Sequence, residues 1–452
     1  MTLQAPSAPI YRRLTTGTVR AGVEELGGRP TMVVRTISTV RRGALSIEDG
    51  ETIRTAAATA ESLRIPIVLV LASSGADVSE GVAALHGWGT AARALTACSG
   101  IVPILVVVTG PAISGPALLL GIADLVIMTT DAYAFVSGPA MVEDFTGVRI
   151  GIHQLGGTAM HARSSGLCAI EAATEEDALA HVDHLLSLLP SNTDELAPRF
   201  PTDDPSDRPV EELREIIPAK TTSSYDVRKV AQALADDHEV TELWTRWSPQ
   251  LVTALARIGG QTVGILANQP QALAGTLDIA ASQKGARFVR FCDAFNLPLV
   301  TLVDTPGFLP GMDLEWRGMI RHGAELAFAY AEATVPRVCV ILRKAFGGAY
   351  IVMDSKGLGN DLCFAWPGAE IAVMGAEGAV QILHRRVDPL ERPALQAEYT
   401  ERFLTPYQAA ERGFVDAVID PGSTRAVLSD ALEVLATGRE SLPGRKHTIG
   451  PL

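Results

Sequence analysis

The feature that most constrains the fold of this 452-residue chain is a repeat, because the second half restates the first at a nearly constant offset. The offset is 232 residues for four landmarks: Gly27–Gly28 and Gly259–Gly260, Gly43 and Gly275, Leu45 and Leu277, and Pro66 and Pro298. It is 233 for Pro103 and Pro336 and for Gly115 and Gly348, and 237 for Gly138 and Gly375. Chance does not hold one offset over so many positions, so the sequence indicates a tandem duplication. The length agrees, since such a chain is too long for one hydrophobic core.

Each copy presents the same order of predicted elements. A glycine pair precedes a β-like run, a helix-like run follows, and a proline then introduces a short apolar run typical of a strand covered on both faces. A second helix and a second proline-led strand lead to a glycine-rich loop, which precedes a further helix and strand. This order predicts an α/β fold, a tandem duplication of two ββα-spiral domains. We expect the domains at 1–190 and 225–452, with a linker rich in Pro, Asp and Ser at 191–224.

Two regions after the linker have their own predicted structure. "YDVRKVAQALADD" and "VTELWTRW" read as helices, and the C-terminal "PLERPALQAEYTERF", "TPYQAAERGFVDAVID" and "STRAVLSDALEVLA" read as amphipathic helices around one short strand.

Composition excludes several classes of protein. Hydrophobic residues make up 47% of the chain and aromatic residues 5%, which favours layered α/β packing. No apolar run is long enough to span a membrane, and the start has no apolar segment of a signal peptide. The net charge of −13 argues against a nucleic-acid binder. The five cysteines form no CxxC pair, so we expect no metal ribbon or disulfide framework, and a cytoplasmic location.

The loop in "RKAFGGAYIVMDSK" carries the chemistry. A helix that begins directly after a strand leaves its first N–H groups without intrahelical partners, and glycine lets a ligand oxygen approach them. Gly348 and Ala349 are therefore predicted to form a donor pair for an oxygen that becomes negatively charged. In the first copy the predicted pair is Ser114 and Gly115, followed by Pro116 at a helix start. Tight helix–strand packing is the alternative explanation for these glycines, and their recurrence in both copies favours function.

Long stretches of the second half identify the chain by resemblance. "RKAFGGAYIVMDSKGLGNDLCFAWPGAEIAVMGAEGAV", "YDVRKVAQALADD", "VGILANQPQALAGTLDIAASQKGARFVRFCDAFNLPLVTLVDTPGFLPG" and "AAERGFVDAVIDP" closely resemble the carboxyltransferase β subunits of biotin-dependent acyl-CoA carboxylases, the acetyl-CoA and propionyl-CoA type. The resemblance extends from about residue 15 to the C-terminus. It implies two crotonase-like (ClpP/crotonase) domains, in agreement with the duplication.

The resemblance also implies an activity and its sites. A carboxyl group passes from biotin to the α-carbon of an acyl-CoA, which the first domain of one subunit and the second domain of a partner hold together. Gly348 and Ala349 would stabilise the biotin ureido oxygen, and Ser114 and Gly115 the thioester enolate. The implied acyl-CoA-binding residues are Ser74, Gly75 and Ala76, and the implied biotin-binding residues are Phe346, Gly347, Thr305, Pro306 and Gly307. Arg41 and Arg42 are added to the acyl-CoA-binding residues as local cations for an anionic ligand in a chain of negative net charge.

The implied partners follow from the same resemblance. Biotin would be carried on a separate carrier subunit, since this chain has no "MKM" motif, and a biotin carboxylase would charge it. We expect a hexamer built from dimers, or a hetero-oligomer with a paralogue. Relatives that prefer propionyl-CoA carry Asp where this chain has Ile351, so Ile351 favours acetyl-CoA or an unusual acyl thioester over propionyl-CoA.

The first half departs from the pattern of its relatives at four places. "SGGAR" is here "SSGAD" at Ser73 to Asp77, and "AGGA" is "ISGP" at Ile113 to Pro116. "TVMGGSL" is "TVRRGAL" at Thr39 to Leu45, and "SGVAH" is "SGLCA" at Ser165 to Ala169. All four fall in the half expected to bind acyl-CoA, which indicates a larger or carrier-bound acyl substrate, a paralogous partner, or a weak CoA site.

Other functions stay open to different degrees. A biotin-dependent decarboxylase of malonyl-type thioesters uses the same fold, and a non-catalytic assembly subunit would explain the altered first half. A hydratase or isomerase would need carboxylates beside the loops, and a serine hydrolase a GxSxG elbow, and the chain has neither. We expect His161 to pack or cap a helix, and Trp244, Trp247 and Trp366 to lie in the core or an interface. Asp304 and Asp354 can titrate usefully only if they are buried.

Overall fold

The chain divides into two compact units in the computed structural model, which describes residues 17–218, 220, 223–436, 438–442, 444 and 447–451. Unit 1 comprises Met1–Pro198 with Trp244–Trp247, and unit 2 comprises Arg199–Leu243 with Ser248–Leu452. The expected linker at 191–224 is divided between them, because Val210 and Leu213 belong to the hydrophobic core of unit 2.

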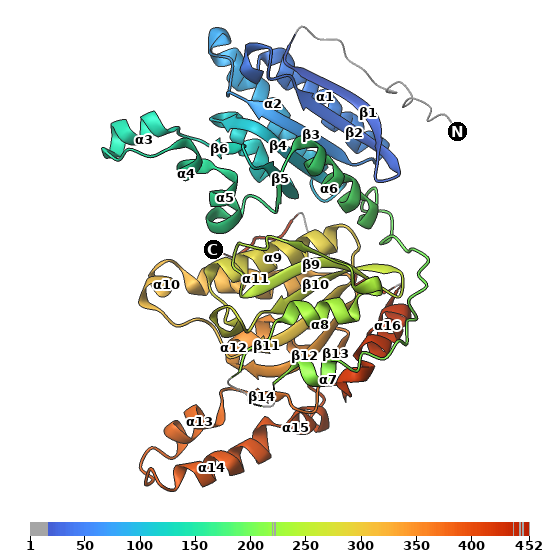
Figure 1. Ribbon diagram of the computed structural model, residues 1–452, viewed down its shortest axis with the longest axis vertical. Helices are drawn as coiled ribbons and strands as arrows, with labels where there is room; N and C mark the ends of the chain where they lie inside the picture. The colour runs from blue at the N-terminus through green and yellow to red at the C-terminus, as the bar shows by residue number, and fades with distance from the viewer. Residues whose placement is uncertain are drawn as a thin grey trace. The chain divides into compact units, whose positions relative to one another are not determined.

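Unit 1 is built on a sheet of seven strands in the order β1-β2-β3-β4-β5-β7, with β6 paired to β4 (Figure 1). The strands are β1 (Val19–Leu26), β2 (Arg29–Thr36), β3 (Ile67–Ser73), β4 (Ile104–Ile113), β5 (Leu125–Thr129), β6 (Tyr133–Phe135) and β7 (Ile170–Ala172). Only the pairing of β1 with β2 is antiparallel. Their two-residue turn, Gly27–Gly28, has φ angles of 60° and 72°, which glycine adopts readily and which match the twist of a hairpin.

The helices of unit 1 follow the predicted order. They are α1 (Ile47–Leu63), α2 (Val82–Cys98), α3 (Pro139–Thr146), α4 (Ile152–Gly156), α5 (Thr158–Met160) and α6 (Glu175–Leu188). The 3-10 helices η1 (Arg41–Gly43), η2 (Val78–Glu80) and η3 (Gly115–Gly121) and the π-helix η4 (His161–Ser165) accompany them. Helices α1 and α2 pack closely, because a methyl group on Gly50 would lie 2.1 Å from the Gly87 carbonyl oxygen. Ser46 caps α1 in a capping box with Asp49. Helices α3 and α4 extend from the sheet as an arm (Figure 1).

Unit 2 repeats this sheet with one added strand, in the order β15-β13-β12-β11-β10-β9-β8, with β14 paired to β12. The strands are β8 (Val240–Leu243), β9 (Leu251–Ile258), β10 (Gln261–Asn268), β11 (Leu299–Thr305), β12 (Arg337–Phe346), β13 (Leu362–Ala365), β14 (Glu370–Ala372) and β15 (Ala417–Val418). The prediction of a helix over "VTELWTRW" is wrong, because Val240–Leu243 pairs antiparallel with β9 at the edge of the sheet.

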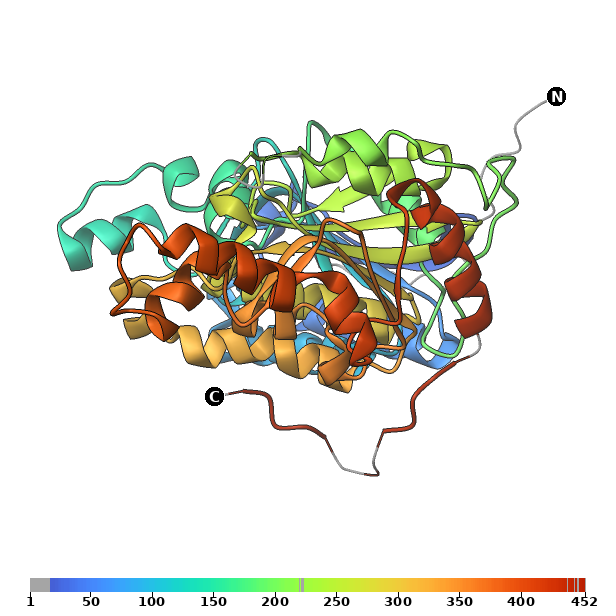
Figure 2. The same cartoon turned by 90° about the horizontal axis from the view of Figure 1, so that it is seen from below.

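The helices of unit 2 cover both faces of its sheet. They are α7 (Leu213–Ile216), α8 (Val227–Leu234), α9 (Ile279–Ala294), α10 (Met312–Trp316), α11 (Met319–Glu332), α12 (Gly347–Val352), α13 (Ala376–Leu383), α14 (Arg392–Tyr399), α15 (Pro406–Glu411) and α16 (Thr424–Leu435), with turns η5 (Asp236–His238), η6 (Leu273–Gly275), η7 (Lys356–Leu358), η8 (Thr400–Leu404) and η9 (Pro421–Ser423). Alternate residues of β10 face opposite layers: Val263 and Ile265 join α8 in one core, and Gly264 faces Cys292 of α9. Figure 2 shows helices of unit 2 on both sides of its strands. The helices predicted after residue 388, around one short strand, are confirmed.

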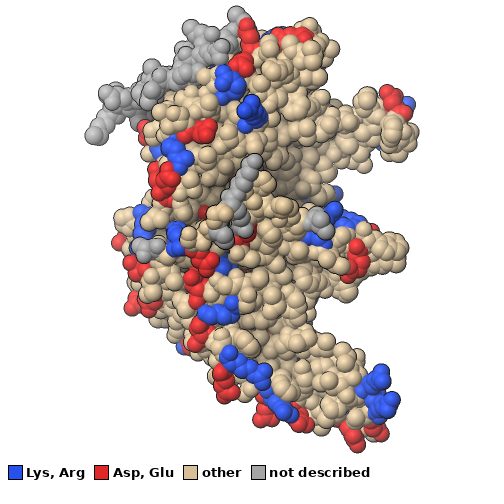
Figure 3. Space-filling model, turned by 180° about the vertical axis from the view of Figure 1, so that it is seen from behind, with Lys and Arg blue, Asp and Glu red and all other residues tan. Residues whose placement is uncertain are grey.

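The two units therefore share one plan, and the predicted fold class is confirmed. Each has an antiparallel hairpin, then parallel strands joined by helices, with a short parallel strand added beside the end of the central strand. On the face drawn in Figure 3, acidic and basic side chains are interspersed. In the described part of the chain no helix has the length and apolar character needed to cross a membrane.

Candidate active site

In each unit the predicted site residues lie where two neighbouring parallel strands end. In unit 1, Ser73 at the end of β3 pairs with Ala112 of β4 after an irregularity in register. In unit 2, Thr305 at the end of β11 pairs with Ala345 of β12 after the same irregularity. A bulge of this kind bends a strand end and redirects the loop that follows. The loop after one strand is thereby brought against the helix start after the other.

In unit 2 the strand β12 runs into helix α12 without an intervening loop. Phe346 ends the strand, and Gly347 opens the helix with φ +61°, a left-handed conformation that favours glycine. Gly348 is exposed, whereas Ala349 is buried. The first N–H groups of a helix have no intrahelical acceptor, so the Gly348 N–H is available to a ligand at the surface.

The loop after β11 faces this helix start. Gly307 accepts a hydrogen bond from the Leu277 N–H at 3.2 Å, and Leu309 donates to the Leu277 carbonyl at 2.8 Å. Phe308 lies between these two contacts, so its own N–H points to the other side, and no acceptor for it lies among the described residues. The Phe308 ring would contact a methyl group on Gly348 at 3.5 Å. The structure thus brings the implied biotin-binding residues of the two loops together.

Unit 1 repeats this arrangement with one correction to the sequence prediction. Ser114, with φ +65°, occupies the place of Gly347, directly after the central strand, and Gly115 that of Gly348. The Ser114 N–H already donates to the Phe135 carbonyl of β6 at 2.9 Å, so it is not free to bind a substrate oxygen. Pro116 stands in the place of Ala349 and has no N–H. The helix start in unit 1 therefore offers the Gly115 N–H.

A second donor in unit 1 was not predicted in this role. Ala76 lies between Gly75, whose carbonyl accepts from Leu45 at 2.8 Å, and Asp77, whose N–H donates to the Leu45 carbonyl at 2.8 Å. The Ala76 N–H points away from Leu45, and the described residues include no acceptor for it. A methyl group on Gly75 would lie 3.3 Å from the Ile113 carbonyl oxygen, so this loop faces the start of η3. The matching offsets of Leu45 and Leu277 could have revealed the equivalence of Ala76 and Phe308.

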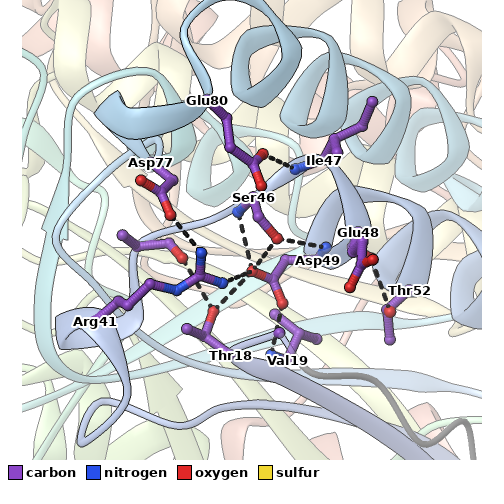
Figure 4. A network of polar contacts seen from close by, with 12 residues as sticks. Thr18, Val19, Arg41, Ser46, Ile47, Glu48, Asp49, Thr52, Asp77 and Glu80 are labelled. Atoms are coloured by element: carbon purple, nitrogen blue, oxygen red, sulfur yellow. Dashed lines mark hydrogen bonds and ion pairs between the residues drawn. The ribbon is translucent and has the colours of Figure 1, made fainter.

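Arg41 and Arg42 are both exposed with left-handed backbone, but they differ in their ion pairs, and Figure 4 shows those of Arg41. Arg41 Nη1 lies 2.5 Å from Asp77 Oδ2, so this cation has a carboxylate partner within the chain. Arg42 is exposed, with left-handed backbone at φ +53°. Ser74 donates its N–H to the Arg42 carbonyl at 3.1 Å, which joins the two implied acyl-CoA loops.

A cavity of about 590 Å³ opens beside α12 in unit 2. Gly347, Gly348 and Ile351 line one side of it, and Ile351 is 43% exposed. The other walls come from β14, η8 and α15, and include Val373, Phe403, Arg412 and Phe414. Ile351 is therefore a wall of an accessible and mainly apolar cavity that begins at Gly348.

Two buried carboxylates lie behind the loops of unit 2. Asp304 accepts from Arg343 Nε at 3.0 Å and from the Lys344 N–H at 3.1 Å. Burial raises its pKa, which the Arg343 guanidinium opposes. Asp354 lies 2.6 Å from Arg337, and burial raises its pKa to about 6 against the opposing effect of that arginine. Both carboxylates have structural partners within the unit, Arg343 and the Lys344 N–H for Asp304 and Arg337 for Asp354.

The contacts of the remaining candidate residues indicate structural roles. His161 Nε2 lies 2.8 Å from the Ala134 carbonyl oxygen and Nδ1 lies 2.7 Å from Ser165 Oγ, and burial lowers its pKa. Trp244 and Trp366 are buried, and Trp366 donates to Thr424 at 2.9 Å. Across the described ranges, no group of three or more His, Cys, Asp or Glu could hold a metal ion.

Comparison with known proteins matches this arrangement over nearly the whole chain. A family model for the carboxyl transferase domain matches residues 4–449. The propionyl-CoA carboxylase carboxyltransferase subunit of Haloferax mediterranei is 44% identical over 444 residues, which cover 96% of this chain and 86% of that protein. The methylmalonyl-CoA decarboxylase subunit alpha of Veillonella parvula is 41% identical over 435 residues, covering 96% of this chain and 85% of that protein.

A solved structure extends the similarity to three dimensions. Transcarboxylase 12S, crystallised as a hexamer assembly with methylmalonyl-coenzyme A and methylmalonic acid bound, superposes with a TM-score of 0.95 at 38% identity. The superposition covers 99% of this chain and 90% of that chain. Both units therefore have counterparts in one known enzyme subunit.

Proposed function

Because the chain belongs to the carboxyl transferase domain family, we propose that its two units divide one reaction, unit 1 holding an acyl-CoA and unit 2 holding biotin. The resemblance read from the sequence is confirmed by this family and by its propionyl-CoA carboxylase relatives. The chain is the carboxyltransferase component of a biotin-dependent acyl-CoA carboxylase, and its substrates are CoA thioesters. The assignment of each substrate to one unit, and of each role to a residue, is our proposal.

One observation supports the assignment of one substrate to each unit. In unit 2 the exposed Gly348 at a helix start faces a loop in which the Phe308 N–H has no acceptor among the described residues. In unit 1 the half-exposed Gly115 faces a loop in which the same holds for the Ala76 N–H. Two pairs of preorganised donors suit a reaction in which two carbonyl oxygens gain negative charge in turn. A single hydrolytic or isomerising site would need only one.

The residues of the chain then have defined tasks. Biotin supplies a carboxyl group on its ureido ring when the carrier delivers it to unit 2. The Gly348 and Phe308 N–H groups would hold the ureido oxygen, with Gly347 and Thr305–Gly307 shaping the loop around it. The Gly115 and Ala76 N–H groups would hold the thioester oxygen while its α-carbon carries negative charge. Ala349 remains a predicted donor, although it is buried.

The proposal also concerns the identity of the acyl group. Ile351 gives the cavity beside α12 an apolar wall, where relatives that prefer propionyl-CoA carry Asp by the resemblance, and the acyl end of a thioester held by unit 1 of a partner chain would enter this cavity. We therefore favour acetyl-CoA, or a longer or unusual acyl thioester that fills the cavity, over propionyl-CoA. Its relatives named above act on propionyl-CoA and methylmalonyl-CoA, so this preference distinguishes the chain from them.

A decarboxylase is the second candidate, and one comparison favours it. The methylmalonyl-CoA decarboxylase subunit of Veillonella parvula is almost as similar to this chain as the carboxylase subunit of Haloferax mediterranei. The same two donor pairs serve transfer in either direction. The partner decides between them: a biotin carboxylase that charges the carrier with ATP would make the chain part of a carboxylase.

The proposed assembly is a hexamer of this chain that receives biotin from a separate carrier subunit. The transcarboxylase 12S structure is described as a hexamer assembly. A hetero-oligomer with a paralogue is the alternative for a chain with an altered first unit.

The test is the reverse transfer on the purified chain, with free biocytin in place of the carrier. Loss of CO2 from malonyl-CoA and methylmalonyl-CoA is followed for the wild type, Gly348→Val and Gly368→Val. A methyl group at Gly348 meets Phe308 at an ordinary 3.5 Å, so the variant folds, but a larger side chain covers the N–H. We expect kcat to fall about 10²- to 10³-fold, the loss typical of a missing oxyanion donor.

Gly368 is the matched control, because it is exposed in unit 2 and a methyl group there meets nothing within 4 Å. Faster turnover of malonyl-CoA than of methylmalonyl-CoA supports the acetyl preference, and the opposite order contradicts it. Equal turnover by wild type and Gly348→Val contradicts the proposed site in unit 2.

A further inference from the structure

Two of the departures from the family pattern meet in the fold of unit 1. By the resemblance of the sequence, relatives carry Met at position 41 and Arg at position 77, where this chain has Arg41 and Asp77. The two side chains form an ion pair, with Arg41 Nη1 2.5 Å from Asp77 Oδ2 (Figure 4). The ion pair joins the start of η1 to the loop that ends at Asp77.

The carboxylate of Asp77 is held on more than one side. Its other oxygen accepts from the Ser79 N–H at 3.0 Å and from the Ser79 hydroxyl at 2.6 Å. The Ser79 hydroxyl and the Arg41 guanidinium lower the pKa of Asp77 against the effect of burial. The side chain of Asp77 is only 9% exposed, and a carboxylate removed from water needs such partners. Asp77 is therefore held in position, although the Arg41 side chain itself is 41% exposed.

Arg41 also reaches a second buried carboxylate. Its Nη2 lies 3.8 Å from Asp49 Oδ2. Asp49 accepts from the Val19 N–H at 2.9 Å and from the Thr18 hydroxyl at 3.0 Å, and it caps α1 with Ser46. Arg41 therefore links the loop that ends at Asp77 to the first strand and the first helix of unit 1 (Figure 4).

The element that this link reaches is the loop with the Ala76 N–H. The loop lies against the start of η3, since a methyl group on Gly75 would be 3.3 Å from the Ile113 carbonyl oxygen. Asp77 is the next residue after Ala76, so a displaced Asp77 turns the Ala76 N–H relative to Gly115. A misplacement of about 1 Å in a site of this kind can lower the rate about 10²-fold.

Unit 2 fixes the equivalent loop by other means. The offset of 232 places Leu273 and Leu309 at the positions of Arg41 and Asp77, and the backbone contacts through Leu277 are the same as those through Leu45. Unit 2 has Pro306 where unit 1 has Ser74. The proline ring fixes one backbone angle of its loop. The loop of unit 1 has no such proline, and the Arg41–Asp77 ion pair restrains it instead.

We propose that the Arg41–Asp77 ion pair is a positioning element that aims the Ala76 N–H, together with the Gly115 N–H, at the thioester oxygen. The inference rests on the proposed function, and it assigns Arg41 to the loop rather than to the phosphates of CoA. Both arginines are exposed, but Arg42 forms no ion pair with a described residue, so Arg42 is the arginine left to meet the nucleotide part of the substrate.

The test compares Arg41→Met, Asp77→Arg and the double variant, which recreates the pattern of the relatives at both positions. Decarboxylation of malonyl-CoA and methylmalonyl-CoA with biocytin gives kcat and KM, and hydrogen exchange reports on the peptide that contains residues 74–77. We expect Arg41→Met to lower kcat 10- to 100-fold with a smaller change in KM, and to speed exchange in that peptide. Asp77→Arg places two arginines side by side and lowers kcat further.

The double variant is decisive. If Arg41 and Asp77 acted independently of each other, the losses of kcat in the two single variants would add in the double variant. We expect it to recover at least tenfold in kcat over Asp77→Arg. Arg54→Met is the matched control: Arg54 is an exposed arginine of unit 1 whose ion pair, with Glu51 at 2.8 Å, lies within α1, and its kcat stays at the wild-type value. A double variant no faster than Asp77→Arg, or an unchanged kcat in Arg41→Met, overturns the proposal.

The experiment separates this inference from the proposed function. If the wild type turns over neither thioester, the proposed function fails, and hydrogen exchange alone then decides the role of the pair. Exchange in the 74–77 peptide that is the same in wild type and Arg41→Met overturns the ion pair as a positioning element.

Discussion

At Asp354 the chain buries a carboxylate completely, directly after helix α12, with Arg337 as its ion-pair partner at 2.6 Å. Its main-chain carbonyl also accepts from the side chain of Asn360. These contacts hold the end of the helix whose first residues are Gly347 and Gly348. The raised pKa of about 6 shows that burial destabilises the charged carboxylate by more than its ion pair with Arg337 stabilises it.

This gives a prediction for the pH dependence of stability. The pKa of Asp354 rises from 3.8 when unfolded to about 6 when folded, so the folded chain binds the proton more tightly. The associated stability is fully present below pH 4 and is lost as the pH rises through 6. Relative to Asp354→Asn, the wild type should lose about 2.5 kcal/mol of unfolding free energy between pH 4 and pH 7.

Urea unfolding of both proteins at one protein concentration, at four pH values between 4 and 7, measures this difference. A gap between wild type and variant that is the same at every pH would contradict the raised pKa. A gap that moves in favour of the wild type as the pH rises would reverse its sign.

At the scale of elements, the strand ends and the loops beside them are held by glycines that no other residue can replace without cost. Gly43 closes the turn η1 with φ +71°, and a methyl group there would lie 2.0 Å from the Ala72 carbonyl oxygen. Gly275 is its equivalent in unit 2, where the Asp304 carbonyl oxygen is 2.6 Å away. In both units the glycine turn, η1 or η6, therefore packs directly against the strand bulge that redirects the site loop.

Gly43→Ala and Gly28→Ala separate this close contact from the cost of left-handed backbone. Both glycines have φ near +70°, but a methyl group on Gly28 meets nothing within 4 Å. We expect Gly28→Ala to cost about 1 kcal/mol of stability and Gly43→Ala about 3 kcal/mol or more, because backbone must move. Thermal and urea unfolding measure both. Equal losses would show that the contact with Ala72 relaxes without cost.

At the scale of the whole molecule, both units expose apolar side chains on their outer helices. In unit 1 these are Met141 and Phe145 of α3, the second 92% exposed. In unit 2 they are Trp316 of α10 and Ile320 of α11, 77% and 84% exposed. Apolar side chains gathered on a surface mark sites of association. An assembly of several copies would cover them, in line with the hexamer assembly of transcarboxylase 12S.

The corresponding prediction is a mass of about 290 kDa in solution, six chains of 47.8 kDa each. Light scattering after size exclusion measures it directly on the purified chain. A single chain in solution would contradict the proposed hexamer, and a stable dimer would indicate that a paralogue or another subunit completes the assembly.

Sequence patterns predicted the elements well because each element is a local property. The glycine pairs, the proline-led apolar strands and the helix after "FGG" appear in the structure where the repeat places them. The failure over "VTELWTRW" has a physical cause: a short apolar and aromatic run fits a helix or a strand, and its pairing with β9 decided between them.

The sequence by itself determined the duplication, the fold and the family, because these follow from periodicity and from long motifs that need no knowledge of contacts. Only the tertiary structure decided which N–H groups are free. Ser114 loses its donor to Phe135, 21 residues away in the chain. It also decided that Arg41 meets Asp77 across 36 residues, and that Asp304 and Asp354 are buried. Pairs at such separations are formed by the packing of strands and loops, and a linear pattern carries no record of them.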